Sequence, residues 1–167
     1  MVLLCSCVES QAQTTPSKEY QIKAVFLYNF TQFVEWHPAA FQQPTAPFVI
    51  GILGEDPFGN YIDQTVAGEN VGGRPIIVRR YKEAKDINSC HILFINSTTI
   101  ANDVLKVIAS RNILTVGDNS NFIRQGGIVR FYTDNNKIRL QINLTAARTA
   151  NLNISSKLLR VADVVGK

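Results

Sequence analysis

The chain has 167 residues, of which 46% are hydrophobic and 18% are charged, and its formal net charge is +4. This length suits one domain with a sizeable core, and the composition argues against a disordered chain. The basic residues are scattered, with Arg79-Arg80 as the only adjacent pair, so the charge pattern does not favour a nucleic-acid groove. We therefore expect no nucleic-acid partner.

We interpret residues 1–12 as the remnant of a signal peptide. Residues 1–8 are short and apolar, and Ser10-Gln11-Ala12 fits the small-x-small pattern for cleavage after Ala12, although no Lys or Arg precedes the apolar run. Two alternatives stay open: a disordered N-terminal tail without a function, and lipidation at Cys7. No apolar run reaches the ~18 residues that cross a bilayer. The sequence therefore predicts a protein that is exported to an oxidising compartment.

The mature chain begins with a flexible lead-in over residues 13–18, and residues 19–166 form a single predicted domain. Within it, residues 19–36 carry apolar side chains three or four positions apart, which predicts an amphipathic helix with an aromatic-rich face. His37-Pro38 ends this helix, because the residue before a proline disfavours helical backbone.

Residues 48–116 alternate between strand and helix patterns. Asp56 is the expected N-cap of the first helix of this region, with Pro57 at the first helical position. This alternation is typical of parallel β-α-β units. The predicted strands are residues 48–53, 75–80, 91–95 and 113–116, and the predicted helical segments are residues 57–67, 81–88 and 100–110, the last one capped by residues 96–99.

Two further strand-like runs follow Gly126-Gly127 and are joined by the tight-turn sequence Asp134-Asn135-Asn136. Residues 145–150 and 154–165 are then predicted as closing helices, the second with a buried stripe of Ile154, Leu158, Val161, Ala162 and Val165. The predicted fold is α/β: a three-layer sandwich with helices on both faces of a mostly parallel sheet of about six strands and a C-terminal antiparallel hairpin.

Two turns follow the carboxyl ends of predicted parallel strands, where open α/β sheets bind their ligands. Each turn offers a carboxylate, and the backbone N–H groups at a helix start are available to an anion. Plain N-capping explains the first turn equally well. Neither turn has a phosphate-binding glycine motif. The candidate ligand-binding residues are Asp56, Phe58, Gly59, Asp118 and Phe122.

Catalytic and metal sites have little support in the sequence. His37 and His91 stand alone, without a Cys or His at ligand spacing, and we expect His91 to be a satisfied core histidine. Cys90 has no nearby basic residue to lower its pKa and is expected to be a buried small hydrophobe without an internal disulfide partner. We therefore expect no metal and no cofactor, and the sequence favours binding over catalysis.

Several motifs in the same order resemble the YfiR-like (HmsC-like) family of periplasmic proteins. The resemblance covers nearly the whole mature chain, and the combination is more specific than any single piece. It rests on residues 20–30 with Val34-Glu35-Trp36, residues 53–59, Gly72-Gly73-Arg74-Pro75, residues 90–95, residues 114–118 with Phe122, Gly126-Gly127, Ile142-Asn143-Leu144 and residues 154–162.

The resemblance implies a non-enzymatic regulator that binds the periplasmic sensor region of an inner-membrane diguanylate cyclase and holds it inactive. Release of the cyclase raises cyclic di-GMP and promotes biofilm matrix production. The resemblance also implies a tendency to form a homodimer. Relatives pair the cysteine matching Cys90 with a first-strand cysteine, and that position here is Gly51. The alternative function is a periplasmic small-ligand-binding module that uses the two turns.

Overall fold

The computed structural model describes residues 15–96 and 101–166. Helices and strands alternate through most of this part of the chain. In order they are α1 (Lys18–Phe33), β1 (Val34–Trp36), the 3-10 turn η1 (Pro38–Ala40), β2 (Phe48–Leu53), α2 (Asn60–Val66), β3 (Asn70–Val71), β4 (Arg74–Tyr81), the 3-10 turn η2 (Ala84–Asp86), β5 (Ile92–Ile95), α3 (Ala101–Ile108), β6 (Leu114–Gly117), β7 (Val129–Asp134), β8 (Lys137–Asn143), α4 (Leu144–Thr149), β9 (Leu152–Ile154), α5 (Ser156–Leu159) and β10 (Asp163–Val165).

Eight strands form the main sheet in the order β10-β8-β7-β6-β5-β2-β4-β3, and β1 pairs with β9 in a separate antiparallel sheet. The five strands β4, β2, β5, β6 and β7 run parallel to one another, and the flanking strands β3 and β8 pair antiparallel with β4 and β7. Their order corresponds to the 2-1-3-4-5 arrangement of flavodoxin-like sheets. The predicted α/β class with a mostly parallel sheet is confirmed, with eight strands instead of about six.

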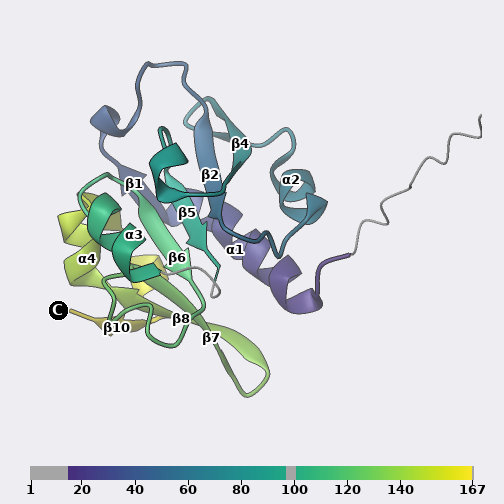
Figure 1. The fold of residues 1–167 in the computed structure, drawn as a ribbon, viewed down its shortest axis with the longest axis vertical. Helices are drawn as coiled ribbons and strands as arrows, with labels where there is room; N and C mark the ends of the chain where they lie inside the picture. The colour runs from purple at the N-terminus through teal and green to yellow at the C-terminus, as the bar shows by residue number, and fades with distance from the viewer. Residues whose placement is uncertain (1–14, 97–100, 167) are drawn as a thin grey trace, which may run out of the picture.

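The central strands are buried on both faces, which explains their continuous apolar sequence. In β5, Ile92 and Phe94 face a core that also contains the inner side chains of α1 and α2. Leu93 and Ile95 face the second core, which α3 covers with Leu105 and Ile108. Figure 1 shows α1 behind the sheet and α3 in front of it, so helices cover both faces.

The predicted hairpin between β7 and β8 is confirmed, with Asp134 paired to Lys137 across a two-residue turn. Asn135 and Asn136 both have positive φ angles, 48° and 59°. Asparagine tolerates this left-handed backbone, and two such residues match the right-handed twist of the flanking strands. The side chains of Leu140 and Ile142, two residues apart on one face of β8, are buried. The hairpin extends away from the helices at the lower right of Figure 1.

The prediction of the C-terminal helix over residues 154–165 was wrong. Only one helical turn, α5, forms there, and it lies between β9 and the edge strand β10. Val161 of the predicted buried stripe is 69% exposed. The physical reason is long-range pairing: Ile154 pairs with Val34, and Val165 pairs with Asn143. These backbone hydrogen bonds override the local helical pattern.

The same pairing shortens the first predicted helix. α1 ends at Phe33, because Val34–Trp36 forms β1 against β9. The predicted helix after β2 also begins later than expected. Asp56 does not cap it, since Gly59 occupies the N-cap position of α2 and Asp56 instead accepts a hydrogen bond from the backbone N–H of Phe58. The expected cap at residues 97–99 lies outside the described residues.

Candidate functional site

The Asp56 side chain, in the turn after β2, is bound by other groups of the protein, among them Arg80 of β4. Asp56 Oδ1 accepts from the N–H of Phe58 at 2.7 Å, and Asp56 Oδ2 forms an ion pair with Arg80 Nε, also at 2.7 Å. Arg80 continues to Asp63 at 2.6 Å and to the carbonyl oxygen of Gly59 at 2.9 Å. Both oxygens of Asp56 are therefore engaged within the protein, although Asp56 is not the helix cap that the capping alternative predicted.

The sheet order reverses between β2 and β5, which is where open α/β sheets form a ligand crevice. In this protein a hydrogen bond spans that point, because the Asn96 side-chain amide donates to the carbonyl oxygen of Glu55 at 2.8 Å. Asn96 directly follows β5, and Glu55 lies in the turn after β2. The end of β5 and this turn are therefore linked to each other.

Asp118, at the end of β6, lies in a more polar setting. Its Oδ2 accepts from the hydroxyl of Tyr20 at 2.9 Å and from Lys23 Nζ at 2.8 Å. Lys23 also pairs with Glu19 at 2.6 Å, and the side chains of Lys23 and Asp118 are only 3% and 11% exposed. Burial, followed by the charge of Asp118, raises the pKa of Tyr20. Asp118 Oδ1 is buried and has no hydrogen-bond partner.

Tyr20 connects the two turns. Its hydroxyl binds Asp118, and its ring packs edge-on against Phe58 with 5.5 Å between ring centroids. Asp56 and Asp118 themselves are not neighbours, because they follow β2 and β6 and β5 lies between these strands. The N-terminal part of α1 therefore bridges the two ends of the predicted site.

Phe58 and Phe122 are core residues with no exposed surface. They belong to opposite faces of the sheet, Phe58 with the α1 side and Phe122 with the α3 side. The ring of Phe122 is fitted between two glycines. A Cβ at Gly127 would lie 2.2 Å from it, and a Cβ at Gly117 would lie 2.6 Å from it. A ligand would meet neither ring without a rearrangement of the core.

A polar groove of about 410 Å³ extends from Asp118 along α1 and β7. Arg130 lines it, and the Nε of Arg130 is the second buried polar atom here without a partner. Sequence reasoning missed the roles of Lys23 and Arg130. Lys23 had a detectable signal, because it lies one residue before Ala24 and four before Leu27 on the buried side of α1. A cation at such a position requires a buried partner.

His91 is a satisfied core histidine, as predicted. Its ring packs against both Phe41 and Phe48, with centroids 4.4 and 4.8 Å away. Nδ1 accepts from the N–H of Val49 at 3.0 Å, and Nε2 lies 3.2 Å from the carbonyl oxygen of Ala40. This geometry requires a neutral ring with its proton on Nε2. Burial, the largest cause, lowers the pKa of His91 to about 4.

Cys90 is buried, as predicted, and its thiol is free in this structure. It donates to the carbonyl oxygen of Ile92 at 3.0 Å, and burial raises its pKa to about 12. The thiolate required of a nucleophile is therefore disfavoured. Within residues 15–96 and 101–166, the histidine, cysteine and carboxylate side chains form no group of three that could hold a metal ion.

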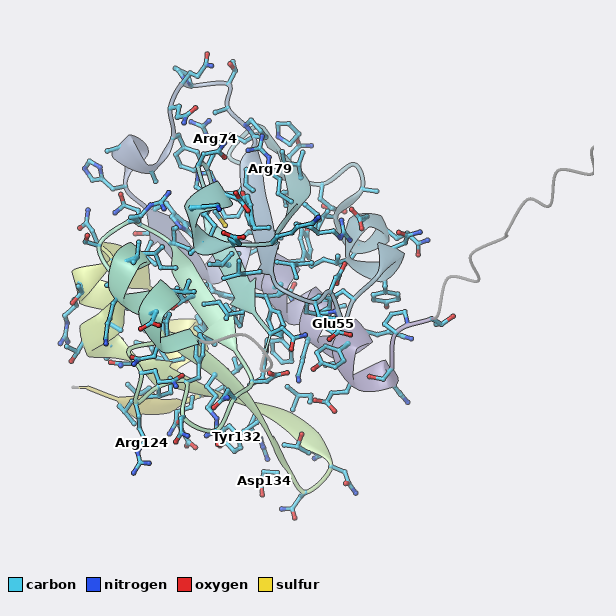
Figure 2. The ribbon with its side chains drawn as sticks, in the orientation of Figure 1. Glu55, Arg74, Arg79, Arg124, Tyr132 and Asp134 are labelled. Atoms are coloured by element: carbon cyan, nitrogen blue, oxygen red, sulfur yellow. The ribbon has the colours of Figure 1, made fainter. Side chains whose placement is uncertain are left out.

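The arginines labelled in Figure 2 do not lie together on one surface. Arg74 and Arg79 lie near one end of the molecule in Figure 2, and Arg124 lies near the other. Tyr132 and Asp134 mark the hairpin of β7 and β8. None of the helices in the described part of the chain is long and apolar enough to cross a membrane.

The fold and these contacts define an α/β protein with a flavodoxin-like strand order, a well-packed core and a polar cluster at one end of α1. A family model described as YfiR/HmsC-like matches residues 20–163. This match covers most of the chain, and the protein belongs to the YfiR/HmsC-like family, which is regulatory rather than catalytic. The predicted resemblance is confirmed. A comparison with curated proteins gave no match.

Proposed function

We propose that this protein is a periplasmic regulator that binds the periplasmic sensor region of an inner-membrane diguanylate cyclase and represses it. The observation that carries the proposal is the family match, which extends from α1 to the beginning of β10 and so includes nearly every element of the fold. The family is consistent with regulation in cyclic di-GMP signalling.

Repression by such a protein is a population shift. The regulator binds the inactive state of the cyclase more tightly than the active state and moves the equilibrium by that difference in affinity. A tenfold difference in affinity, about 1.4 kcal/mol, changes the ratio of the two states at most tenfold. Strong repression therefore requires a partner surface that is correctly shaped in only one state.

The outer face of α1 offers an apolar surface for such a contact. Ile22 and Val25 are 40% and 41% exposed, and they lie three residues apart, on one face of the helix. Lys23 points inward from the same helix and is held by Asp118. This buried ion pair fixes the rotation of α1 about its axis, so the apolar pair stays directed to solvent. Val107 and Val161 are exposed singly on other elements.

The test is capture of the partner. Tagged protein comprising residues 13–167 is incubated with detergent-solubilised membranes of its own source, and bound proteins are identified by mass spectrometry. We expect enrichment of a cyclase with a periplasmic sensor domain, and a rise in cyclic di-GMP when the gene is deleted. If no membrane protein is enriched and cyclic di-GMP is unchanged on deletion, the proposal is wrong.

Variants locate the contact. The double substitution Ile22→Ser and Val25→Ser should reduce capture at least tenfold, while Val107→Ser, at a valine of α3 that is 68% exposed, should not. Analytical ultracentrifugation of each variant measures whether a homodimer forms and whether the substitutions disrupt it. Equal capture by the double variant and by Val107→Ser would exclude the outer face of α1 as the contact.

We propose, as a second candidate, a small-ligand-binding module at the polar groove. The favouring observation is that Asp118 Oδ1 and Arg130 Nε are both buried without a partner beside the same groove. An unsatisfied buried polar atom costs about 1–3 kcal/mol, and a ligand with a donor and an acceptor would recover part of that cost. A saturable thermal shift with an amino acid, nucleotide or anion, lost in Asp118→Asn but kept in the surface variant Arg139→Gln, would support it. Absence of a shift across a broad panel would contradict it.

A further inference from the structure

A second, chemically different pocket of about 230 Å³ lies between α3 and α4 on the front of the sheet. Its floor consists of buried aliphatic side chains, among them Leu105, Ile108, Ile113 and Ile128, each at most 3% exposed. Its mouth includes the exposed residue Ala109. The pocket is therefore open to solvent at one end and apolar at the other.

The side-chain oxygen atoms that line this pocket already have partners. Thr115 Oγ1 accepts from the N–H of Ile128 at 3.0 Å, and Asn143 Oδ1 accepts from the N–H of Ala146 at 3.1 Å. The hydroxyl of Thr149 donates to the carbonyl oxygen of Thr145 at 3.1 Å. No charged side chain is among the residues that line the pocket.

The buried polar atoms that lack a partner lie elsewhere. In the described part of the chain they belong to Asp118, Gln125 and Arg130, and none of these residues lines this pocket. A charged or strongly polar ligand would therefore lose its hydration and find no charged side chain and no buried unpaired atom in compensation. The lining therefore disfavours the charged or polar ligands that suit the groove at Asp118 and favours an apolar ligand.

We propose that the pocket between α3 and α4 is a binding site for a small, neutral, apolar molecule such as a substituted aromatic ring. The size supports this class, since an apolar cavity of about 150 Å³ in another protein binds benzene. A pocket of about 230 Å³ has room for a ring with one or two substituents. A bound ring would contact Leu105 and Ile108 of α3 and Ala146 of α4 together, and would hold the two helices to each other.

The experiment is a titration of the mature chain with toluene, observed through the ¹³C-labelled methyl groups of isoleucine. We expect saturable chemical-shift changes at Ile108, Ile113 and Ile128, and none at Ile22 on the far side of the sheet. The shape-matched probe 4-methylpyrimidine carries two ring nitrogens that would be left without donors, and it should bind at least tenfold more weakly. Equal or tighter binding of 4-methylpyrimidine would overturn the proposed chemistry.

Filling the pocket provides the second arm. Ala146→Leu places a larger side chain in the pocket and should weaken toluene binding at least tenfold, and Ala109→Leu at the exposed mouth serves the same purpose if the first variant unfolds. Ala67→Leu, at the exposed end of α2, should leave the affinity unchanged. Shifts that do not saturate, or that persist unchanged in a folded filling variant, would overturn the proposal.

Discussion

Gly51→Cys should create a disulfide with Cys90. A Cβ built at Gly51 would lie 2.7 Å from Cys90 Sγ, and in a disulfide each Cβ lies about 3 Å from the more distant sulfur. The same Cβ would lie 2.7 Å from Cε2 of Tyr81, whose hydroxyl donates to the carbonyl oxygen of Ser89 at 2.7 Å. The ring of Tyr81 must therefore shift when residue 51 gains a side chain.

Two opposing free energies determine the result. Added atoms in a packed core destabilise by about 1–3 kcal/mol, so reduced Gly51→Cys should unfold more easily than the wild type. The disulfide closes a loop of about 40 residues, which stabilises by about 4 kcal/mol in the chain-entropy model. The free energy of unfolding of oxidised Gly51→Cys should therefore be about 1–3 kcal/mol higher than that of the wild type.

The assay is urea unfolding of residues 13–167, which lack Cys5 and Cys7, as the wild type and as Gly51→Cys, with and without reductant. Mass spectrometry counts free thiols in the same samples. Gly51→Ala is the matched control, since it adds the clash without the second sulfur and should be insensitive to reductant. If oxidised Gly51→Cys keeps two free thiols in the folded state, the placement of residue 51 against Cys90 is wrong.

Three further substitutions test the buried contacts. Lys23→Met should lower the free energy of unfolding by about 3–5 kcal/mol, because it leaves the carboxylate of Asp118 buried and unpaired, and a loss below 1 kcal/mol in urea unfolding would contradict that contact. Gly127→Ala should cost about 1–3 kcal/mol through its clash with Phe122, and a neutral result would show that the ring is free to move. His91 has a pKa near 4 in the folded state and 6.5 in the unfolded state, so the unfolded state binds more protons between pH 4 and pH 6.5. The free energy of unfolding should therefore fall by about 3 kcal/mol as the pH drops from 6.5 to 4. His91→Gln should remove that part of the pH dependence, and an unchanged pH profile would refute the assignment.

The elements that the sequence predicted well are those with local or two-sided burial signals. β2 was predicted with its observed ends because all six of its residues are buried and a turn rich in glycine and acidic residues follows it. The hairpin of β7 and β8 carried a period of two and a turn of two asparagines. Each of these signals lies within a few neighbouring residues, so no knowledge of the tertiary fold was needed.

The segments that the sequence did not predict depend on partners far along the chain. β1 and β9 each have three residues, and Glu35 pairs with Asn153 although more than 100 residues separate them. A short stretch of sequence contains no sign of such a pairing.

The candidate site was also predicted only in part. The strand-end rule identified Asp118. Lys23 became a neighbour of that carboxylate only through the packing of α1, and Arg130 only through the pairing of β6 with β7.

The two candidate functions meet on α1. On the inner face of α1, Tyr20 and Lys23 bind Asp118. On the outer face of α1, Ile22 and Val25 are exposed to solvent. A ligand that competes for Asp118 would loosen the contacts that fix the rotation of α1, and would therefore change the affinity for a partner bound to the outer face. Such coupling is reciprocal, since each molecule must alter the affinity for the other by the same factor. Asp118→Asn weakens the ion pair without touching the outer face, so it should weaken partner capture about 5–150-fold if the helix couples the sites. Unchanged capture by a folded Asp118→Asn protein would show that the groove and the outer face act independently.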